Sequence, residues 1–347
     1  MTRRTRRFIF YSLVFIFIII TPPTILYAVG YSFDWQNLTI KETGALFLAS
    51  QPTEAQVFLN DQFHKKTPQL LSHLLPGNYQ IIVTQEGFYP WQKNLEVQAG
   101  LVTEARNIFL FPKEPDLKLV ATNVTSTPEL FLSDAQTRKD QQQAQSLAST
   151  TAGWQLKNNQ LFYLERATGF FWRTDLSGSI KEQLASDALP LQNYLIKTIT
   201  GNRFLALGQD GRLFYLQKGS SPWQKISDKI AAVDFSADEK KILWVSGKEI
   251  WVRWLDDALI QPYRLAGDQE LIARFSAPVT QAIFYPSGEH IAFVVNDQIK
   301  VAELDSRDRR NIIDFFIAKN SRIFLNPQDS SLCFNQKNDL YCVVLEK

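Results

Sequence analysis

The sequence predicts an all-β protein that begins with a transmembrane helix and continues as a small β-sandwich and a β-propeller of about five blades, or six if some are short. Three observations lead to this fold class: an uncharged apolar run near the N-terminus, short alternating strands over residues 44–112, and repeats over residues 117–347. Aromatic residues make up 13% of the chain, and with frequent Val, Ile and Leu they favour strands over helices.

The apolar run extends over Phe8–Phe33, which we expect to be the transmembrane helix. Its 26 residues would reach ~39 Å as a helix, enough to cross a hydrocarbon core of ~30 Å. Pro22 and Pro23 interrupt the run, and Phe8–Ile20 alone would span only ~20 Å. We therefore expect a kinked helix that continues beyond the prolines.

The residues that flank this run predict its orientation. Four arginines precede it: Arg3, Arg4, Arg6 and Arg7. Because Lys and Arg remain on the cytoplasmic side, residues 1–7 are expected to form a cytoplasmic tail, and residues from about Asp34 onward to lie outside the cell membrane. Aromatic rings that favour the headgroup layer gather at the far end, at Tyr27, Tyr31, Phe33 and Trp35. Residues 34–43 would be a linker.

A cleaved signal peptide is the alternative interpretation. It would have a basic start, an apolar region over Phe8–Ile20, and small residues at Ala28 and Gly30 near a cut. A twin-arginine export signal at Arg6-Arg7 fits less well, because the stretch that follows is very apolar. The anchor and the signal peptide both export the rest of the chain.

About 310 residues follow the apolar run, enough for two ordinary domains. Of the 37 Lys and Arg, four lie in the N-terminal cluster, which leaves 33 against 35 Asp and Glu. Phosphate binding requires a basic surface, so this balance argues against a nucleic-acid partner.

The two cysteines, Cys333 and Cys342, are the candidate disulfide. If Leu332–Val344 forms a hairpin centred between Lys337 and Asn338, the two residues face each other across the strands, within disulfide range. An exported domain permits their oxidation. The alternative is a pair of small apolar thiols on one strand face.

Short strands separated by turn residues predict a small sandwich over residues 44–112. The expected strands are residues 45–49, 56–59, 78–84 and 101–111, and the expected turns are Asn60-Asp61, Pro76-Gly77 and Gly87. Alternation is clearest where Tyr79, Ile81 and Val83 face one way.

This segment also resembles a known family. The residues that carry the resemblance are Ser50, Pro52, Ala55, Val57, Leu59-Asn60-Asp61, Thr67-Pro68, Leu71, Leu74, Pro76-Gly77, Tyr79, Ile81, Val83, Gly87-Phe88-Tyr89 and Trp91. Their spacing resembles a PEGA domain, although the naming tetrapeptide reads Pro52-Thr53-Glu54-Ala55 and the usual Asp-Gly hairpin reads Asp61-Gln62. The resemblance implies a β-sandwich module of prokaryotic envelope and membrane proteins, commonly joined to other domains, with no catalytic constellation.

The prominent side chains of this segment are expected to be structural. Phe88, Tyr89 and Trp91 would be core or lid residues rather than an aromatic ligand platform. His64 and His73 are nine residues apart without a third ligand nearby, so we expect no metal site there.

The second domain is predicted from its repeats. Residues 233–256 align without a gap on residues 282–305 at an offset of 49, and a third copy follows at an offset of 41. Each copy has a turn, an apolar strand, a two-residue turn such as Asn296-Asp297, and a second strand. Antiparallel units of this length are typical of propeller blades, and the turns resemble PD40 or TolB-type WD40-like repeats.

Two further segments complete the prediction for residues 117–347. A strand at Leu117–Val120 or Glu129–Leu132 is expected to pair with the last blade and close the ring. The polar tract between Asp134 and Gly153 lacks apolar residues to pack, and we expect a mobile loop, with a functional arm as the alternative.

No motif for phosphate binding, nucleophilic catalysis or metal binding occurs in the sequence, and we expect no cofactor. His290 occupies the repeat position of Lys241, which suggests a solvated turn. Three aspartates at repeat-equivalent or turn positions would cap turns: Asp238, Asp256 and Asp305.

These observations favour a non-catalytic, membrane-anchored envelope protein whose propeller face holds a protein or glycan partner, with binding residues unknown. An extracytoplasmic enzyme with acidic residues in the propeller channel is the alternative. An external sensor is a third hypothesis, and its short cytoplasmic tail would require a membrane partner.

Overall fold

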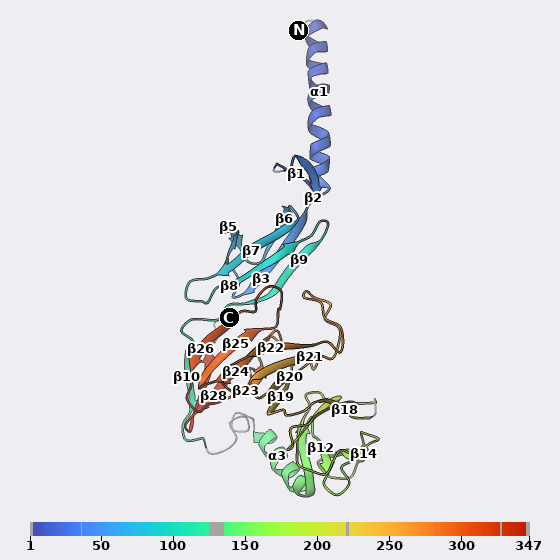
Figure 1. Cartoon of the computed structure of the whole chain (residues 1–347), viewed down its shortest axis with the longest axis vertical. Coiled ribbons are helices and arrows are strands. Elements are labelled where there is room, and N and C mark those ends of the chain that lie inside the picture. The colour runs from blue at the N-terminus through green and yellow to red at the C-terminus, as the bar shows by residue number, and fades with distance from the viewer. Residues whose placement is uncertain (1–2, 36, 125–134, 220–221, 327, 345–347) are drawn as a thin grey trace. The chain divides into compact units, whose positions relative to one another are not determined.

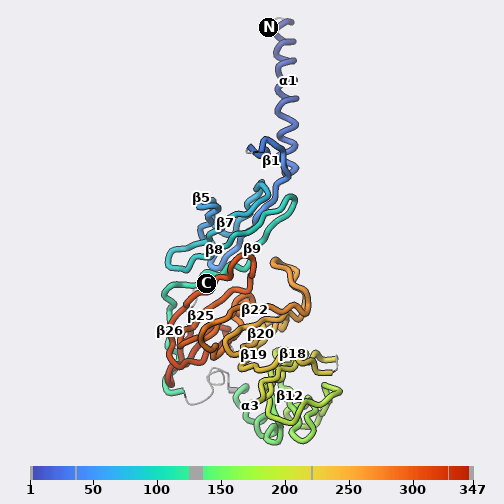
Figure 2. The backbone as a smooth tube through the Cα atoms, viewed as in Figure 1, coloured from blue at the N-terminus to red at the C-terminus, as the bar shows by residue number. Residues whose placement is uncertain are grey.

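The computed structural model describes residues 3–35, 37–124, 135–219, 222–326 and 328–344. The chain forms two compact units (Figures 1 and 2). The first consists of Met1–Leu110 with Arg307–Arg309, and the second of Phe111–Ser306 with Arg310–Lys347. Strands dominate both units, as the composition predicts.

The first unit begins with helix α1 (Arg3–Ala28), which continues through Pro22 and Pro23. None of its residues is buried, and its most apolar stretch has a mean hydropathy of 2.2. It is long and apolar enough to cross a membrane, and equally compatible with a signal peptide. The helix ends earlier than the predicted boundary at Phe33, because Gly30 adopts a positive φ of 99° and turns the chain into a strand.

A short hairpin follows the helix, where the sequence suggested only a linker. It consists of β1 (Tyr31–Asp34) and β2 (Thr39–Glu42). The two strands are antiparallel and pair Phe33 with Ile40. The linker expected over residues 34–43 is therefore ordered for the most part as a two-stranded sheet.

Two sheets then form the predicted sandwich. One has the order β6-β3-β9, with β3 (Gly44–Gln51), β6 (Gln69–Leu74) and β9 (Val102–Phe109). The other has the order β5-β4-β7-β8, with β4 (Gln56–Leu59), β5 (Gln62–Lys66), β7 (Gly77–Thr84) and β8 (Trp91–Val97). Ile81, Val83 and Trp91 lie in the core, where Tyr79 and Phe88 pack against them. The expected inward face and the structural role of Trp91 are confirmed.

The turn at Asn60-Asp61 is also confirmed. Both residues have positive φ values, 48° and 64°, and the flanking pair is Leu59 opposite Gln62. Two successive left-handed residues make the tight two-residue turn that suits a β-hairpin, and Asn and Asp tolerate this conformation better than other non-glycine residues.

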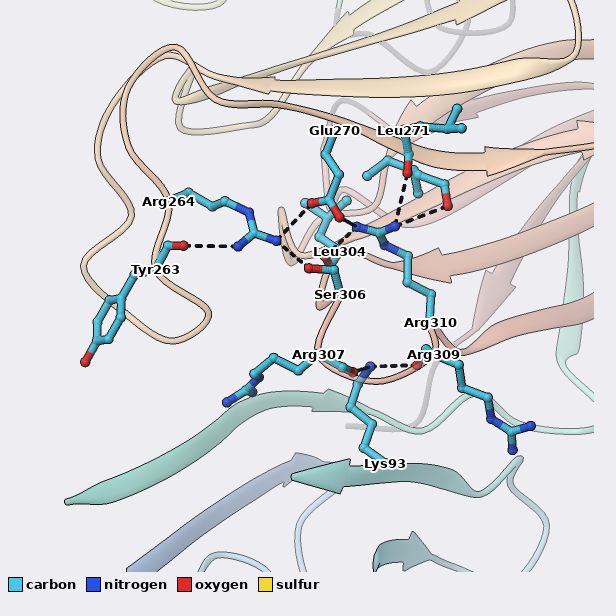
Figure 3. Close-up of polar contacts among 11 residues, drawn as sticks. Lys93, Tyr263, Arg264, Glu270, Leu271, Leu304, Ser306, Arg307, Arg309 and Arg310 are labelled. Atoms are coloured by element: carbon cyan, nitrogen blue, oxygen red, sulfur yellow. Dashed lines mark hydrogen bonds and ion pairs between the residues drawn. The ribbon is translucent and has the colours of Figure 1, made fainter. Parts of the chain in front are cut away.

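A buried lysine fixes the late segment Arg307–Arg309 within the first unit (Figure 3). Lys93 on β8 is fully buried, and its ammonium donates hydrogen bonds to the carbonyl oxygens of Arg307 at 2.8 Å and Arg309 at 2.9 Å. The carboxylate of Asp308 accepts hydrogen bonds from the backbone and side-chain nitrogens of Asn94. A buried charge requires such partners.

The described residues of the second unit form five four-stranded antiparallel sheets, each of the kind found in a propeller blade. The first is β11 (Thr151–Lys157), β12 (Gln160–Glu165), β13 (Phe171–Asp175) and β14 (Lys181–Gln183). The second is β15 (Tyr194–Lys197), β16 (Arg203–Gly208), β17 (Leu213–Gln217) and β18 (Gln224–Ser227). The third is β19 (Ala232–Phe235), β20 (Lys241–Ser246), β21 (Glu249–Trp254) and β22 (Gln269–Arg274). The fourth is β23 (Val279–Phe284), β24 (His290–Val295), β25 (Gln298–Glu303) and β26 (Ile312–Ile317).

The fifth blade combines strands from distant parts of the chain, in the order β10-β29-β28-β27. It contains β27 (Arg322–Leu325), β28 (Leu332–Gln336), β29 (Asp339–Val344) and β10 (Asp116–Ala121). The prediction that Leu117–Val120 pairs with the last blade is confirmed, and the alternative Glu129–Leu132 lies outside the described residues. Strands β20 and β24 begin 49 residues apart, the predicted repeat offset.

Polar side chains on the first strands connect successive blades. The side-chain oxygen of Gln155 accepts a hydrogen bond from Thr198 N, and Lys197 forms an ion pair with Asp234 at 2.8 Å. Asp234 also accepts from Phe284 N at 3.1 Å. Farther along, Gln281 exchanges two hydrogen bonds with the backbone of Ile323. These contacts link the five blades in chain order. The apolar cores lie on the faces of the sheets.

The polar tract before the first blade is a helix and not the expected mobile loop. Helix α3 (Ala135–Leu147) and the 3₁₀ turn η1 (Ala148–Thr150) precede β11. Ala144 and Ala148 are buried against Leu161. Alanine and glutamine have high helix propensity, and two alanines provide enough apolar contact to hold the helix against the blade.

Candidate functional site

Two residues that the sequence placed in a solvated turn are buried in the second unit. Lys241 and His290 begin β20 and β24 and are 6% and 3% exposed. The ammonium of Lys241 donates to Gly288 O at 2.9 Å and pairs with Glu289 at 2.8 Å, in the turn of the next blade. The expectation of a solvated turn is wrong, because other residues cover both side chains: the turn of the next blade covers Lys241, and Phe111 packs on His290.

His290 is the second of these residues. Its Nδ1 lies 3.1 Å from the hydroxyl of Ser287, and its ring meets the Phe111 ring edge-on at 5.6 Å. Burial lowers the pKa of His290 to about 3. The imidazole is therefore neutral at ordinary pH, which suits a packing role.

A turn before Lys241 forms the boundary with the preceding blade. Glu239 has a positive φ of 54°, the conformation that Gly288 adopts at the equivalent position of the next blade. Its carboxylate accepts hydrogen bonds from the backbone nitrogens of Ile199 and Thr200 and from the Thr200 hydroxyl. The three hydrogen bonds offset the ~1–2 kcal/mol that this conformation costs a residue with a side chain.

An open pocket of 450 Å³ lies at this boundary. Its lining is polar and consists of Thr200, Asn202, Arg203, Gln217, Lys218, Asp238, Glu239 and Asp256. Arg203 donates to Glu239 O and pairs with Asp256 at 2.6 Å, and this hydrogen bond to Asp256 raises the pKa of Arg203. Arg203 and Asp256 thus bind each other and join two blades.

The aspartates expected to cap turns behave differently from one another. Asp238 accepts hydrogen bonds from the Ser236 hydroxyl at 2.6 Å and from Lys240 N at 3.1 Å, so it caps its turn as predicted. Asp256 instead pairs with Arg203 of the preceding blade. Among the residues that the structure describes, no three His, Cys, Asp or Glu side chains gather as a metal-binding group.

The cysteines lie in the predicted register. Cys333 pairs with Cys342 across β28 and β29, with Cα atoms 4.0 Å apart, and their sulfur atoms form a disulfide. The bond joins the two central strands of the blade that β10 completes, so it has a structural place.

The strongest candidate for an interaction site is a long connection between β21 and β22, which we call the apolar loop (residues 255–268). Leu259, Ile260, Tyr263 and Leu265 are all more than half exposed, with Leu259 at 83% and Tyr263 at 65%. Several large apolar side chains on one exposed segment mark an interaction surface more often than a chance exposure. In Figure 3 the Tyr263 ring points away from the body of the unit.

The base of the apolar loop is held by two arginines that share one carboxylate (Figure 3). Arg264 and Arg310 pair with Glu270 at 2.9 and 2.5 Å. Arg264 also donates to the Ser306 hydroxyl, and Arg310 to the carbonyl oxygen of Leu271 at 3.1 Å. All three charged side chains are mostly shielded from water, which strengthens charge-assisted hydrogen bonds.

Backbone contacts fix the loop further. Ala258 and Arg264 exchange two backbone hydrogen bonds, and Asp257 accepts one from Ala266 N at 2.7 Å. The Arg264 guanidinium lies over the Trp254 ring at 5.2 Å. The tip is therefore presented on a fixed base, which limits the entropy that binding would cost.

A difference in repeat spacing indicates this loop in the sequence, although the repeat alignment did not identify it. Strands β21 and β25 begin 49 residues apart, whereas the strands that follow them, β22 and β26, begin 43 apart. The third blade thus carries six extra residues in this connection. An insertion of this kind interrupts a repeat without disturbing its strands, and loops of this kind commonly carry function.

One comparison with known proteins matches a segment of the first unit. The PEGA domain family model matches residues 43–108, so the sandwich is a PEGA domain, as its residue pattern predicts. A search of curated proteins gives no match.

Two solved structures share a remote likeness with the chain. The β-propeller domain of Cps50 (Swd1) from Myceliophteria thermophila has 14% identity and a TM-score of 0.38, covering 55% of this chain and 67% of that one. A nidogen/laminin complex has 9% identity and a TM-score of 0.35, covering 53% and 74%. At these values neither likeness carries an argument, and the propeller-type architecture rests on the sheets described above.

Proposed function

We propose that this protein is a non-catalytic, single-pass membrane-anchored protein of the cell envelope. In this proposal α1 holds the N-terminus in the cytoplasm, and the PEGA domain and the blades lie on the other side. The blade unit binds a partner protein through the apolar loop. The observation that carries the proposal is the exposed apolar tip on a charge-fixed base.

The composition of the loop favours a protein partner over a glycan. Its exposed residues are mostly aliphatic, whereas glycan sites combine aromatic faces with polar groups that bind hydroxyls. Tyr263 supplies a ring with a polar end, a residue type enriched at the centres of protein interfaces. A projecting loop of this composition suits a partner that presents an apolar groove.

Photo-crosslinking in living cells tests the binding site. A benzophenone amino acid placed at Tyr263 is expected to capture one discrete protein. The matched control is the same amino acid at Ile180, which lies in another blade and is 62% exposed. The Ile180 probe is expected to leave that protein uncaptured.

A second variant links capture to the apolar side chains. The double substitution Leu259→Ser and Ile260→Ser should abolish capture by the Tyr263 probe, because it removes apolar contact area and leaves the base of the loop intact. Equal capture at both probe positions would reject the loop as the site. Adducts with lipid alone would point to the membrane as its partner.

Protease accessibility tests the orientation. An epitope tag at the C-terminus should be digested when protease is added to cells whose outer layers are permeable but whose cytoplasmic membrane is intact. A tag that is protected there and digested only after lysis would contradict the proposed topology.

A further inference from the structure

We propose that the β1–β2 hairpin is a second membrane contact, whose apolar face rests in the lipid headgroup layer where α1 leaves the bilayer. The inference depends on the proposed membrane anchor. It adds a lipid-binding surface that belongs to the folded part of the first unit and not to the helix.

One face of the hairpin carries exposed apolar side chains toward its turn, and at the end nearer α1 the same face has Tyr31 paired with the exposed Glu42. Phe33 and Ile40 pair across the strands, and the Trp35 ring meets the Phe33 ring edge-on at 4.7 Å. Leu38 follows in the turn. Trp35 is 81% exposed, and the other three are partly or mostly exposed, so water would surround an apolar cluster if nothing covered this face.

The opposite face of the hairpin is polar and internally paired. Asp34 is buried and forms an ion pair with Lys41 at 2.8 Å. Its carboxylate also accepts a hydrogen bond from the Asn37 side chain at 2.8 Å. A hairpin with an apolar cluster near its turn and charged side chains elsewhere on its surface matches a boundary between lipid and water, in the way that interfacial helices do.

The length of the helix places the hairpin at this boundary. From Phe8 to Ala28 the helix contains 21 uncharged residues, which span ~32 Å and match the ~30 Å hydrocarbon core. The chain then needs only Val29 and Gly30 before β1 begins. If α1 spans a bilayer, the hairpin begins at the headgroup layer, where Trp rings are favoured.

Contacts with the sandwich hold the hairpin and the helix end together. The Thr43 nitrogen and hydroxyl both donate to Gly30 O, at 2.8 and 2.5 Å. The Tyr27 ring stacks on the His73 ring at 4.1 Å, and His73 Nε2 lies 3.0 Å from Tyr27 O. The PEGA domain is thereby joined to the helix end by folded contacts, and a lipid contact of the hairpin would fix its orientation to the membrane.

Site-specific fluorescence in bilayers tests this inference. The two native cysteines form a disulfide, so a single introduced cysteine can be labelled with an environment-sensitive dye. The full-length protein is reconstituted in vesicles of phosphatidylethanolamine and phosphatidylglycerol, with or without headgroup-attached nitroxide lipids. The variants are Trp35→Cys in the hairpin, Ile16→Cys in the helix, and Phe63→Cys as a matched control on an exposed ring of β5.

The dye at position 35 is expected to emit at shorter wavelength than the dye at position 63 and to lose about half of its emission to the headgroup nitroxides. The dye at position 63 should lose none. A nitroxide on the acyl chain should quench the dye at position 16.

The outcomes separate the inference from the anchor. Quenching at position 16 with water-like emission at position 35 would overturn the inference and leave the anchor standing. No quenching at position 16 would reject the anchor, and the inference with it. Equal quenching at positions 35 and 63 would also overturn it, because contact would not be specific to the hairpin.

Discussion

Buried polar residues at equivalent strand positions make different contacts in successive blades. Lys241 reaches the turn of the next blade and binds Gly288 and Glu289, while His290 packs against Phe111. A lysine and a histidine can replace each other here because both place an apolar stem in the core and a nitrogen at its edge. Each choice, however, responds differently to acid.

For His290 we expect a measurable acid sensitivity. Its pKa is lowered by burial to about 3, whereas an unfolded histidine titrates near ~6.5. The unfolded state therefore binds the proton first as the pH falls, and the contribution of His290 to stability is full above ~6.5 and lost progressively toward ~3. From about pH 7 to about pH 4.5 the loss amounts to ~2–3 kcal/mol.

The variant His290→Gln removes this titration. Urea unfolding of the blade unit at both pH values should show a smaller loss of stability in the variant than in the wild type, although the variant is less stable at neutral pH. His64→Gln, on the exposed strand β5, is the control. Identical pH profiles for wild type and His290→Gln would contradict the expected role of burial.

Among the elements, the apolar loop depends on one carboxylate. Glu270 binds both Arg264 and Arg310, so its removal leaves two guanidinium groups without their shared partner. Partly buried charges left unpaired are costly, and the loop is expected to open more often as a result.

The substitution Glu270→Gln should raise the rate of chymotrypsin cleavage within residues 255–268 about tenfold, equivalent to ~1.4 kcal/mol of local opening. Mass spectrometry of the fragments locates the cuts. Glu249→Gln in the same blade is the control, since Glu249 pairs with the exposed Arg274. A cleavage rate no higher than that of the control would show that the ion pairs do not hold the loop.

The repeats made the blades predictable, because strands at constant spacing leave a periodic apolar pattern. The two-residue turn at Asn296-Asp297 and the register of Cys333 with Cys342 followed from the same pattern. Helix α3 was not predicted because its apolar contacts come from alanines, which produce only a weak hydrophobic periodicity in the sequence. The apolar loop was not predicted because the exposure of a side chain depends on which residues the fold leaves uncovered. In the sequence, Leu259 cannot be distinguished from a core leucine.

At the scale of the whole molecule, the second unit is held together by pairing between a strand near its start and a strand near its end. Strand β10 pairs with β29 over five residue pairs, and β29 lies between β10 and β28. Removing β29 would therefore expose two strand edges at once, and open edges promote aggregation.

A chain that stops after Gln336 is expected to lose the fifth blade and aggregate, because it lacks β29 and leaves β10 unpaired. Size-exclusion chromatography and circular dichroism of the detergent-solubilised protein measure this. The control stops after Val344 and keeps β29 whole. Retention of a monodisperse, fully folded product without β29 would show that β10 does not depend on its partner.

The pairing of β10 with β29 also determines when the fifth blade can form during synthesis of the chain. Leu119 pairs with Tyr341, 222 positions later in the chain. At ~5–20 residues per second a ribosome needs roughly 10–45 s to bridge that interval. During this interval β10, with leucines at 117 and 119, has been synthesised but its partner strand has not. The fifth blade therefore cannot be completed until β29 has been synthesised, and a nascent chain that stalls before β29 would leave this blade unfinished.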